Sequence, residues 1–201
     1  MQNKGFAMNR RGFIAALAAT AALPSQLMAL TSSQAEVLVG RLVDDINKVI
    51  ASGKSLSTMV RDFEGIFKRY GDVKIIALSA LGPDARGLSG AQERAYVDAF
   101  TGYISRKYGK RFNEFVGGRI EVDGTRKVNS FYEVQGTAYL KGEAPFQLNF
   151  LVSDRSGKDL FFDMIIEGIS LRLTEKSEIG AMLDKQRGNI DGLITELKKA
   201  G

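Results

Sequence analysis

The stretch FFDMIIEGISL, from Phe161 to Leu171, holds two carboxylates in an otherwise apolar run, and paired carboxylates commonly serve general acid and base catalysis. In a β-strand, Asp163 and Glu167 lie on the same face, about 13 Å apart. This separation exceeds the roughly 5–9.5 Å between the two carboxyl groups of glycoside hydrolases. We therefore expect both side chains to form ion pairs on the less buried face of a sheet.

The other side chains that commonly carry catalysis are missing from the sequence. Its 201 residues include no histidine and no cysteine, which excludes thiol nucleophiles, imidazole bases and the usual zinc and copper ligand sets. The segment GLSGAQ lacks the Lys-Ser/Thr pair of a phosphate-binding loop, and EF-hand spacing is absent. We predict no cofactor from these residues, and ligation of Ca²⁺ or Mg²⁺ by oxygen atoms stays open as an alternative.

The first residues have the pattern of an export signal. Arg10 and Arg11 precede Gly12 and the apolar pair Phe13-Ile14, and an alanine-rich run follows. A basic start, a short apolar stretch and a small-residue exit are typical of a secretory signal, and the adjacent arginines resemble the twin-arginine type. An ordinary Sec signal is the alternative. We predict a signal peptide over residues 1–29, one domain over residues 30–201, and a periplasmic location.

The charge balance argues against a nucleic-acid partner. Residues 1–29 contain Lys4, Arg10 and Arg11 and no acidic residue, so removing them lowers the net charge of +5 by three. The rest of the chain is close to neutral and lacks the strong basic excess of nucleic-acid-binding proteins. No later segment has the apolar length of a membrane-spanning helix. We expect neither a nucleic-acid partner nor a membrane span.

The elements that must position these side chains follow from hydrophobic periodicity. A capping box at Ser89 and Gln92 marks one helix start. Turn-rich segments separate the four predicted strands and imply an antiparallel meander. The predicted helices cover residues 38–50, 56–70 and 73–82, a fourth begins at this capping box and ends before Gly117-Gly118, and further helices lie near 179–183 and 190–197. The predicted strands cover residues 119–124, 128–140, 146–154 and 160–173. This order predicts an α+β fold with helices on one face of a curved sheet.

Aromatic and aliphatic side chains fall on the inward stripes of these elements. Core packing alone explains such stripes, and sequence pattern does not distinguish a filled core from a hollow one. The residues that would line a hollow are Phe63, Phe67, Tyr96, Phe100, Ile104, Tyr132, Val134, Leu148, Phe150, Phe162, Met164 and Ile166.

Two blocks of the sequence resemble the toluene-tolerance/MlaC family of periplasmic lipid carriers. One block is ALSALGPDARGLSGAQERAYVDAFTGYISRKYGKRF, from Ala77 to Phe112. The other is FFDMIIEGISL, which matches the D-x-x-x-E-G-I-S-L block of the family and is the more specific of the two. A hopanoid-associated branch of the same family is an alternative source of the likeness.

The resemblance implies an NTF2-like sheet whose added helices enclose an apolar pocket for phospholipid acyl chains. It further implies a shuttle between an outer-membrane lipoprotein complex and an inner-membrane ABC transporter complex, without catalytic residues or metal. Under this interpretation Phe162, Met164 and Ile166 line the pocket. Two other interpretations remain: an adaptor without a cavity, and an NTF2-like enzyme that uses Asp163 or Glu167 as a base.

Overall fold

The computed structural model of the chain describes residues 29–201, without the side chains of residues 112 and 113. Except for its last residue, the predicted signal peptide lies outside this range. The helices are α1 (Ser32–Ile50), α2 (Leu56–Tyr70), α3 (Val73–Leu81), α4 (Gly90–Gly109), α5 (Leu171–Lys185) and α6 (Ile190–Leu197), with 3-10 turns η1 (Gly82–Gly87) and η2 (Lys110–Asn113). The strands are β1 (Arg119–Val128), β2 (Phe131–Tyr139), β3 (Phe146–Ser153), β4 (Leu160–Ile166) and β5 (Ile169–Ser170).

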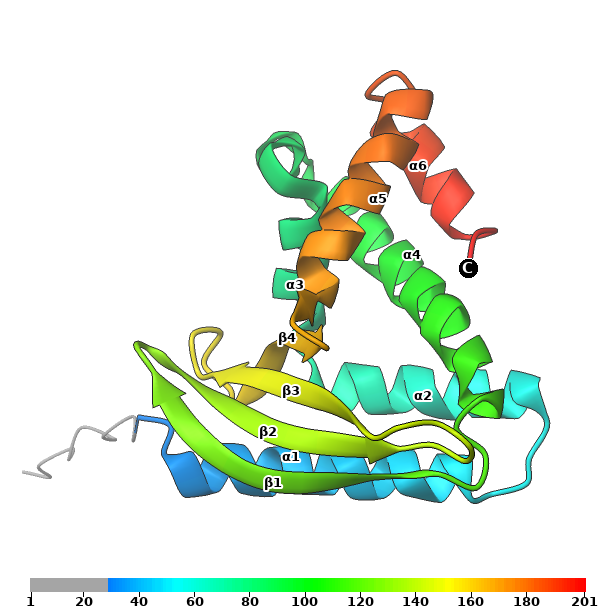
Figure 1. Cartoon of the computed structure of the whole chain (residues 1–201). Helices are drawn as coiled ribbons and strands as arrows, with labels where there is room; N and C mark the ends of the chain where they lie inside the picture. The colour runs from blue at the N-terminus through cyan, green and yellow to red at the C-terminus, as the bar shows by residue number, and fades with distance from the viewer. Residues whose placement is uncertain (1–28) are drawn as a thin grey trace, which may run out of the picture.

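The strands form one antiparallel sheet in the order β1-β2-β3-β4-β5. Figure 1 shows the curved sheet lying along α1 and α2, while α3, α4, α5 and α6 rise from it as a second group. The prediction of an α+β fold with helices before and after an antiparallel sheet is confirmed. Within residues 29–201, no helix combines the length and apolar character that crossing a bilayer requires.

Side-chain caps fix where the main helices begin. Ser89 accepts from the backbone N–H of Gln92, whose side chain accepts from the backbone N–H of Ser89, so the predicted capping box is present. An equivalent box between Thr31 and Gln34 starts α1. Such caps satisfy backbone donors that the first turn of a helix leaves without partners. The caps therefore fix the N-terminal ends of α1 and α4.

The fourth predicted strand is wrong in its second half. Instead of one strand over residues 160–173, the chain turns back at Glu167-Gly168, forms the short β5, and begins α5 at Leu171. Both turn residues have positive φ, 51° and 80°, as a two-residue hairpin of this type requires. The sheet consequently has five strands, and α5 starts directly beside the end of β4.

The first predicted hairpin also differs from the structure. Strand β1 continues through Val128 and turns at Asn129-Ser130, where Asn129 has φ 53°. The segment DGTRK, expected as a turn, instead lies inside β1 at a register shift between Val122 and Gly124. A bulge of this kind bends the strand, which contributes to the curvature of the sheet.

The core lies between the sheet and the helices. Val134, Phe150 and Val152 are almost fully buried on the concave face of the sheet, and Leu42 and Ile50 of α1 are buried opposite them. A second part of the core, around Tyr96 and Phe100, joins α4 to the other upright helices. The interior is therefore divided between a sheet–helix layer and a helical group.

Candidate functional site

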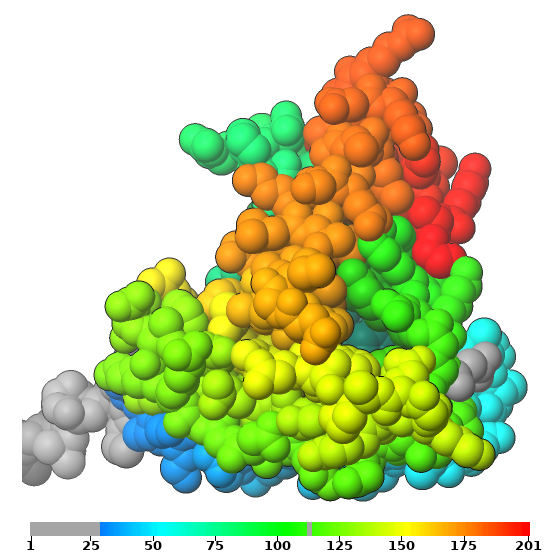
Figure 2. Space-filling model, in the orientation of Figure 1, coloured from blue at the N-terminus to red at the C-terminus, as the bar shows by residue number. Residues whose placement is uncertain are grey.

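An apolar cleft lies where the two parts of the fold meet. Its first lobe has a cavity volume of about 80 Å³ and the second about 120 Å³, and the two lobes share Ile46, Phe63, Tyr108, Phe150 and Met164. The first lobe reaches toward α3 and α5, and the second toward β1 and the end of α4. Figure 2 shows a hollow between α5, α4 and the sheet at this junction.

The predicted pocket residues divide into two groups. Those that line one or both lobes are Phe63, Phe67, Ile104, Leu148, Phe150, Met164 and Ile166. Those that lie outside the lining of both lobes are Tyr96, Phe100, Tyr132, Val134 and Phe162. The structure therefore gathers the predicted residues of α2 with those of β3 and β4, and it leaves the first half of α4 and strand β2 outside the lining.

The residues outside the lining have other surroundings. Tyr96 and Phe100 are fully buried in the helical group, where the Tyr96 hydroxyl donates to the carbonyl of Ala77. Burial raises the pKa of the Tyr96 hydroxyl, which holds it neutral. Val134 lies in the core of the sheet–helix layer, and Tyr132 stands under the ammonium group of Lys127. These four side chains stabilise the scaffold that surrounds the cleft.

A bulge in β4 exchanges the roles of Phe161 and Phe162. Strand parity predicted Phe162 on the same face as Met164, but the register jumps between Leu151 and Val152 and leaves Phe162 as the extra residue. Phe161 therefore lines the first lobe, with its ring 6.1 Å from that of Phe150. Phe162 instead packs edge-on against Phe131, with 5.5 Å between the ring centroids.

The junction of α2 and α3 holds Phe161 in place. The backbone N–H of Asp72 donates to the carbonyl of Phe161 at 2.8 Å, and Gly71 forms a β-bridge with the same residue. A Cβ atom on Gly71 would lie 2.8 Å from the carbonyl oxygen of Phe67 and 3.0 Å from the Phe161 ring. The glycine thus permits the close approach that brings this aromatic ring into the cleft.

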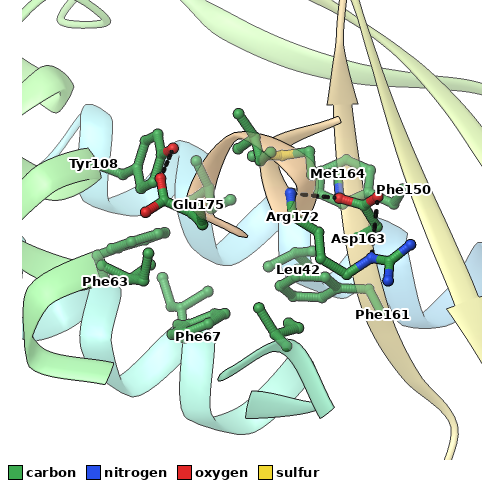
Figure 3. Close-up of a pocket in the computed structure, with 15 residues that line it drawn as sticks. Leu42, Phe63, Phe67, Tyr108, Phe150, Phe161, Asp163, Met164, Arg172 and Glu175 are labelled. Atoms are coloured by element: carbon green, nitrogen blue, oxygen red, sulfur yellow. Dashed lines mark hydrogen bonds and ion pairs between the residues drawn. The ribbon is translucent and has the colours of Figure 1, made fainter. Parts of the chain in front are cut away.

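Asp163 is buried at the corner between β4 and α5, and its oxygens are occupied (Figure 3). Its carboxylate accepts from the backbone N–H groups of Met164 and Arg172 and from the hydroxyl of Ser170. The Arg172 guanidinium lies 3.6 Å away and also donates to Ser79 of α3. This carboxylate therefore anchors the start of α5. The predicted ion pair of Asp163 with a nearby arginine is present, but its predicted place on the less buried face of the sheet is wrong, because the side chain is buried.

Glu167 forms the turn that follows β4. Its backbone N–H donates to the carbonyl of Gln147, and its carboxylate accepts from the backbone N–H of Gln147. These contacts extend the pairing of β3 with the end of β4 and place the side chain away from both lobes of the cleft. Neither carboxylate of the FFDMIIEGISL stretch is arranged as a catalytic base.

A polar cluster bridges α4 and α5 at the edge of the cleft. Glu175 of α5 accepts from the ammonium group of Lys107 at 2.7 Å and from the hydroxyl of Tyr108 at 2.5 Å. Glu178, one turn later, accepts from Lys107 and from Tyr103. Burial and hydrogen bonds to the two glutamates raise the pKa of the Tyr103 and Tyr108 hydroxyls. Both tyrosines are therefore neutral donors at any physiological pH.

Sequence reasoning missed several residues of the lining. Leu42 and Ile46 of α1 belong to the helical stripe of residues 38–50, and that stripe could have identified them. Glu175 falls just after the incorrectly extended fourth strand, so its position facing the cleft had no signal in the pattern. Additional lining residues are Ile66, Ile76, Tyr108, Arg111, Phe115, Ile120, Phe146, Asp163, Leu171 and Arg172.

The fold and the cleft define an α+β protein with an apolar cleft between a curved sheet and helices, and residues 29–201 hold no cluster of metal-ligating side chains. The sequence profile of the MlaC protein family matches residues 40–199. The chain belongs to the MlaC family, whose members are lipid-binding carriers rather than enzymes.

A solved structure with the same fold is the phospholipid-binding protein of Ralstonia solanacearum, determined in complex with a phospholipid. It aligns with a TM-score of 0.70 and 20% sequence identity, covering 82% of this chain and 95% of that chain. The match confirms the fold that the resemblance implied.

Proposed function

We propose that the chain is a periplasmic carrier that encloses the acyl chains of a phospholipid in the two-lobed cleft. In this function it shuttles the lipid between an outer-membrane lipoprotein complex and an inner-membrane ABC transporter complex. Membership of the MlaC family, the phospholipid in the similar Ralstonia solanacearum structure, and the predicted export signal support this proposal.

The apolar lining of the cleft is the observation that carries the proposal. Side chains from α1, α2, β3 and β4 present hydrocarbon surface at one junction. The polar groups of the lining are few: Tyr108 of α4, Arg111 of η2, Asp163 of β4, and Arg172 and Glu175 of α5. A phospholipid carries some thirty tail methylenes, and exposing them to water costs roughly 25 kcal/mol at about 0.8 kcal/mol each. A carrier with an apolar wall offsets most of this cost during transfer.

Two lobes that share a junction suit a ligand with two tails. Each lobe has room for only a few groups of the size of a water molecule, whose share of the liquid is about 30 Å³. The walls must therefore separate when tails enter. Met164 lies at the junction, and its unbranched, flexible side chain can adjust to tails of different shape.

Contacts of this kind also allow unloading. Apolar contacts are non-directional, so binding strength follows the buried area and not a fixed geometry. A lipid bilayer offers its tails a similar environment. A carrier that holds lipid through apolar area therefore returns it without having to break a set of specific hydrogen bonds.

A charge placed in the lining tests the proposal. Ile166 is partly buried and lines the second lobe, so we expect Ile166→Asp to lose most of the lipid that co-purifies with the wild-type chain. Solvent extraction followed by mass spectrometry measures the loss and identifies the lipid, including a hopanoid. Stoichiometric lipid in the purified variant would refute the assignment of Ile166 to the lipid-binding wall of the cleft.

A nearby isoleucine gives a matched control. Ile169 lies three residues further on, is 63% exposed, and is not part of the lining of either lobe. We expect Ile169→Asp to carry the same charge change and to retain wild-type amounts of lipid. Equal loss from both variants would mean that the effect came from altered folding or charge and not from the cleft.

A further inference from the structure

One carboxylate oxygen in the lining of the cleft has no hydrogen-bond partner. The Glu175 side chain is only 3% exposed, and its Oε1 atom accepts from both Lys107 and Tyr108. Its Oε2 atom is buried and meets no donor among the described side chains and backbone groups. An ionised carboxylate offers about four acceptor positions, and buried ones are usually satisfied. This atom therefore requires an explanation.

Arg172 provides an informative contrast on the same helix. Its Nε atom is also buried without a hydrogen bond, but the Asp163 carboxylate lies 3.6 Å away and its Nη1 atom donates to Ser79. The charge of this guanidinium is thus balanced within the protein. Both donors that reach Glu175 bind its Oε1 atom, and no donor reaches Oε2. The Oε2 atom is therefore a stronger candidate for a ligand contact than the Nε atom of Arg172.

Glu175 also stands where the cleft changes from apolar to polar. It lines the first lobe beside Tyr108, which both lobes share (Figure 3). Its neighbours in the cluster reach solvent, since the Lys107 and Glu178 side chains are 25% and 43% exposed. A headgroup whose tails occupy the lobes would lie at this edge, between the hydrocarbon wall and water.

We propose that Oε2 of Glu175 accepts a hydrogen bond from an N–H or O–H group of the bound lipid's headgroup. The carrier then prefers headgroups with a donor, such as a primary ammonium or a hydroxyl, over a choline headgroup, which has none. This inference rests on the proposed phospholipid-carrier function. The separation of the cleft walls that admits the tails also gives the headgroup access to this oxygen.

The test uses vesicles that contain equal amounts of phosphatidylethanolamine, phosphatidylglycerol and phosphatidylcholine with identical tails. The purified full chain, freed of lipid by detergent exchange, is incubated with the vesicles, re-isolated and analysed by mass spectrometry. We expect the ethanolamine lipid to exceed the choline lipid by about tenfold, as one hydrogen bond to a charged group supplies. These two lipids have the same net charge, so the comparison isolates the donor.

The glycerol headgroup shows which donor suffices. Enrichment of phosphatidylglycerol together with the ethanolamine lipid assigns the contact to any donor, and enrichment of the ethanolamine lipid alone assigns it to the ammonium group. Equal uptake of all three lipids would overturn the inference and leave the carrier function intact. A chain that takes up no lipid at all would overturn the carrier function itself.

Two variants test whether Glu175 is the source of the headgroup preference. Glu175→Gln replaces one carboxylate oxygen by an N–H donor, and we expect it to bind lipid without the tenfold preference. Glu178→Gln removes the same charge from the same cluster, but Glu178 does not line either lobe, so we expect it to keep the preference. Retention of the preference in Glu175→Gln, or its loss in Glu178→Gln, would contradict the assignment. If Glu175→Gln does not fold, equal uptake of the three lipids by the wild-type chain would still overturn the inference.

Discussion

The two carboxylates of the FFDMIIEGISL stretch have structural roles at the corner where β4 leads into α5. Asp163 collects donors from the backbone of α5 and from the Ser170 hydroxyl, while Glu167 takes the positive φ that the turn demands. A residue with positive φ is uncommon outside glycine, asparagine and aspartate, and it is strained for a branched side chain. Both residues therefore position the chain at this corner, Asp163 through its carboxylate and Glu167 through its backbone conformation.

The backbone of Glu167 can be tested by substitution. We expect Glu167→Val to lower the free energy of unfolding by about 1–2 kcal/mol, because a β-branched side chain is strained at φ 51°. Glu167→Asn should stay close to wild type, since asparagine tolerates this conformation. Urea unfolding measures both. A valine variant as stable as the asparagine variant would show that the turn relaxes.

The Lys107–Glu175 pair gives a second prediction at this scale. Removal of the ammonium group in Lys107→Met leaves a buried carboxylate with Tyr108 as its remaining donor, so we expect a loss of about 2–3 kcal/mol in unfolding free energy. Lys48→Met breaks an ion pair whose lysine is 75% exposed and should leave the stability close to that of the wild type. Similar values for both variants would contradict the burial argument.

Single residues of the cleft could be predicted only where strand or helix parity is regular. The positions of Phe150, Met164 and Ile166 could be predicted from the alternation of β3 and β4. The pairing of these strands is regular at these residues, where Phe150 pairs with Met164. Phe161 could not be predicted, because a one-residue bulge has no signature in an alternation of apolar side chains. The open oxygen of Glu175 depends on contacts between α4 and α5, which are distant in sequence.

At the scale of elements, the start of α5 depends on Asp163. We expect Asp163→Ala to lower the free energy of unfolding by about 3 kcal/mol, because two backbone N–H groups and a hydroxyl lose their acceptor in a buried corner. Urea unfolding measures the loss. Asp159→Ala, in the loop before β4, is the control and should remain near wild type. Equal stability of the two variants would mean that α5 does not need this anchor.

The cluster between α4 and α5 gives stability a defined dependence on pH. Burial acts to raise the pKa of Glu178, but hydrogen bonds from Lys107 and Tyr103 outweigh it and hold the pKa below its usual value. The folded-state pKa therefore lies below the unfolded value of about 4.3. Its contribution is fully present above the unfolded pKa and is lost as pH falls through the folded pKa.

Comparison of the wild type with Glu178→Gln tests this direction. We expect the wild type to be more stable at pH 7 by less than about 1 kcal/mol, because the side chain is partly exposed and solvent screens the pair. The difference should shrink as pH falls from about 5 toward the lowered pKa. Urea unfolding at a series of pH values measures it. A difference that grows on acidification would reverse the assigned sign.

Most elements could be predicted from sequence because their periodicity is long and their ends are marked. The helix that became α4 has both an apolar stripe and the Ser89 capping box, and one face of β3 is apolar at every second residue, at Leu148, Phe150 and Val152. The boundary between β4 and α5 could not be predicted. Residues 169–173 continue an apolar alternation, whereas the turn residues and the Asp163 anchor impose a helix at Leu171.

At the scale of the whole molecule, the cleft lies between two parts that different contacts hold together. Helix α5 packs on α3 and α6, while it joins α4 through the long polar side chains of the Lys107–Glu175 cluster. Figure 1 shows the upright helices meeting the sheet layer only at their lower ends. The general position of the hollow followed from the inward stripes, but its division into lobes depends on packing that sequence pattern does not contain.

The narrow cleft has a consequence for hydrostatic pressure. Voids that unfolding eliminates make the unfolded state smaller, so compression favours unfolding in proportion to them. Acyl tails that pack against Phe150 and Met164 would fill the empty volume of the cleft. When the pressure is raised in steps at constant temperature, the lipid-bound chain should therefore unfold at a higher pressure than the lipid-free chain.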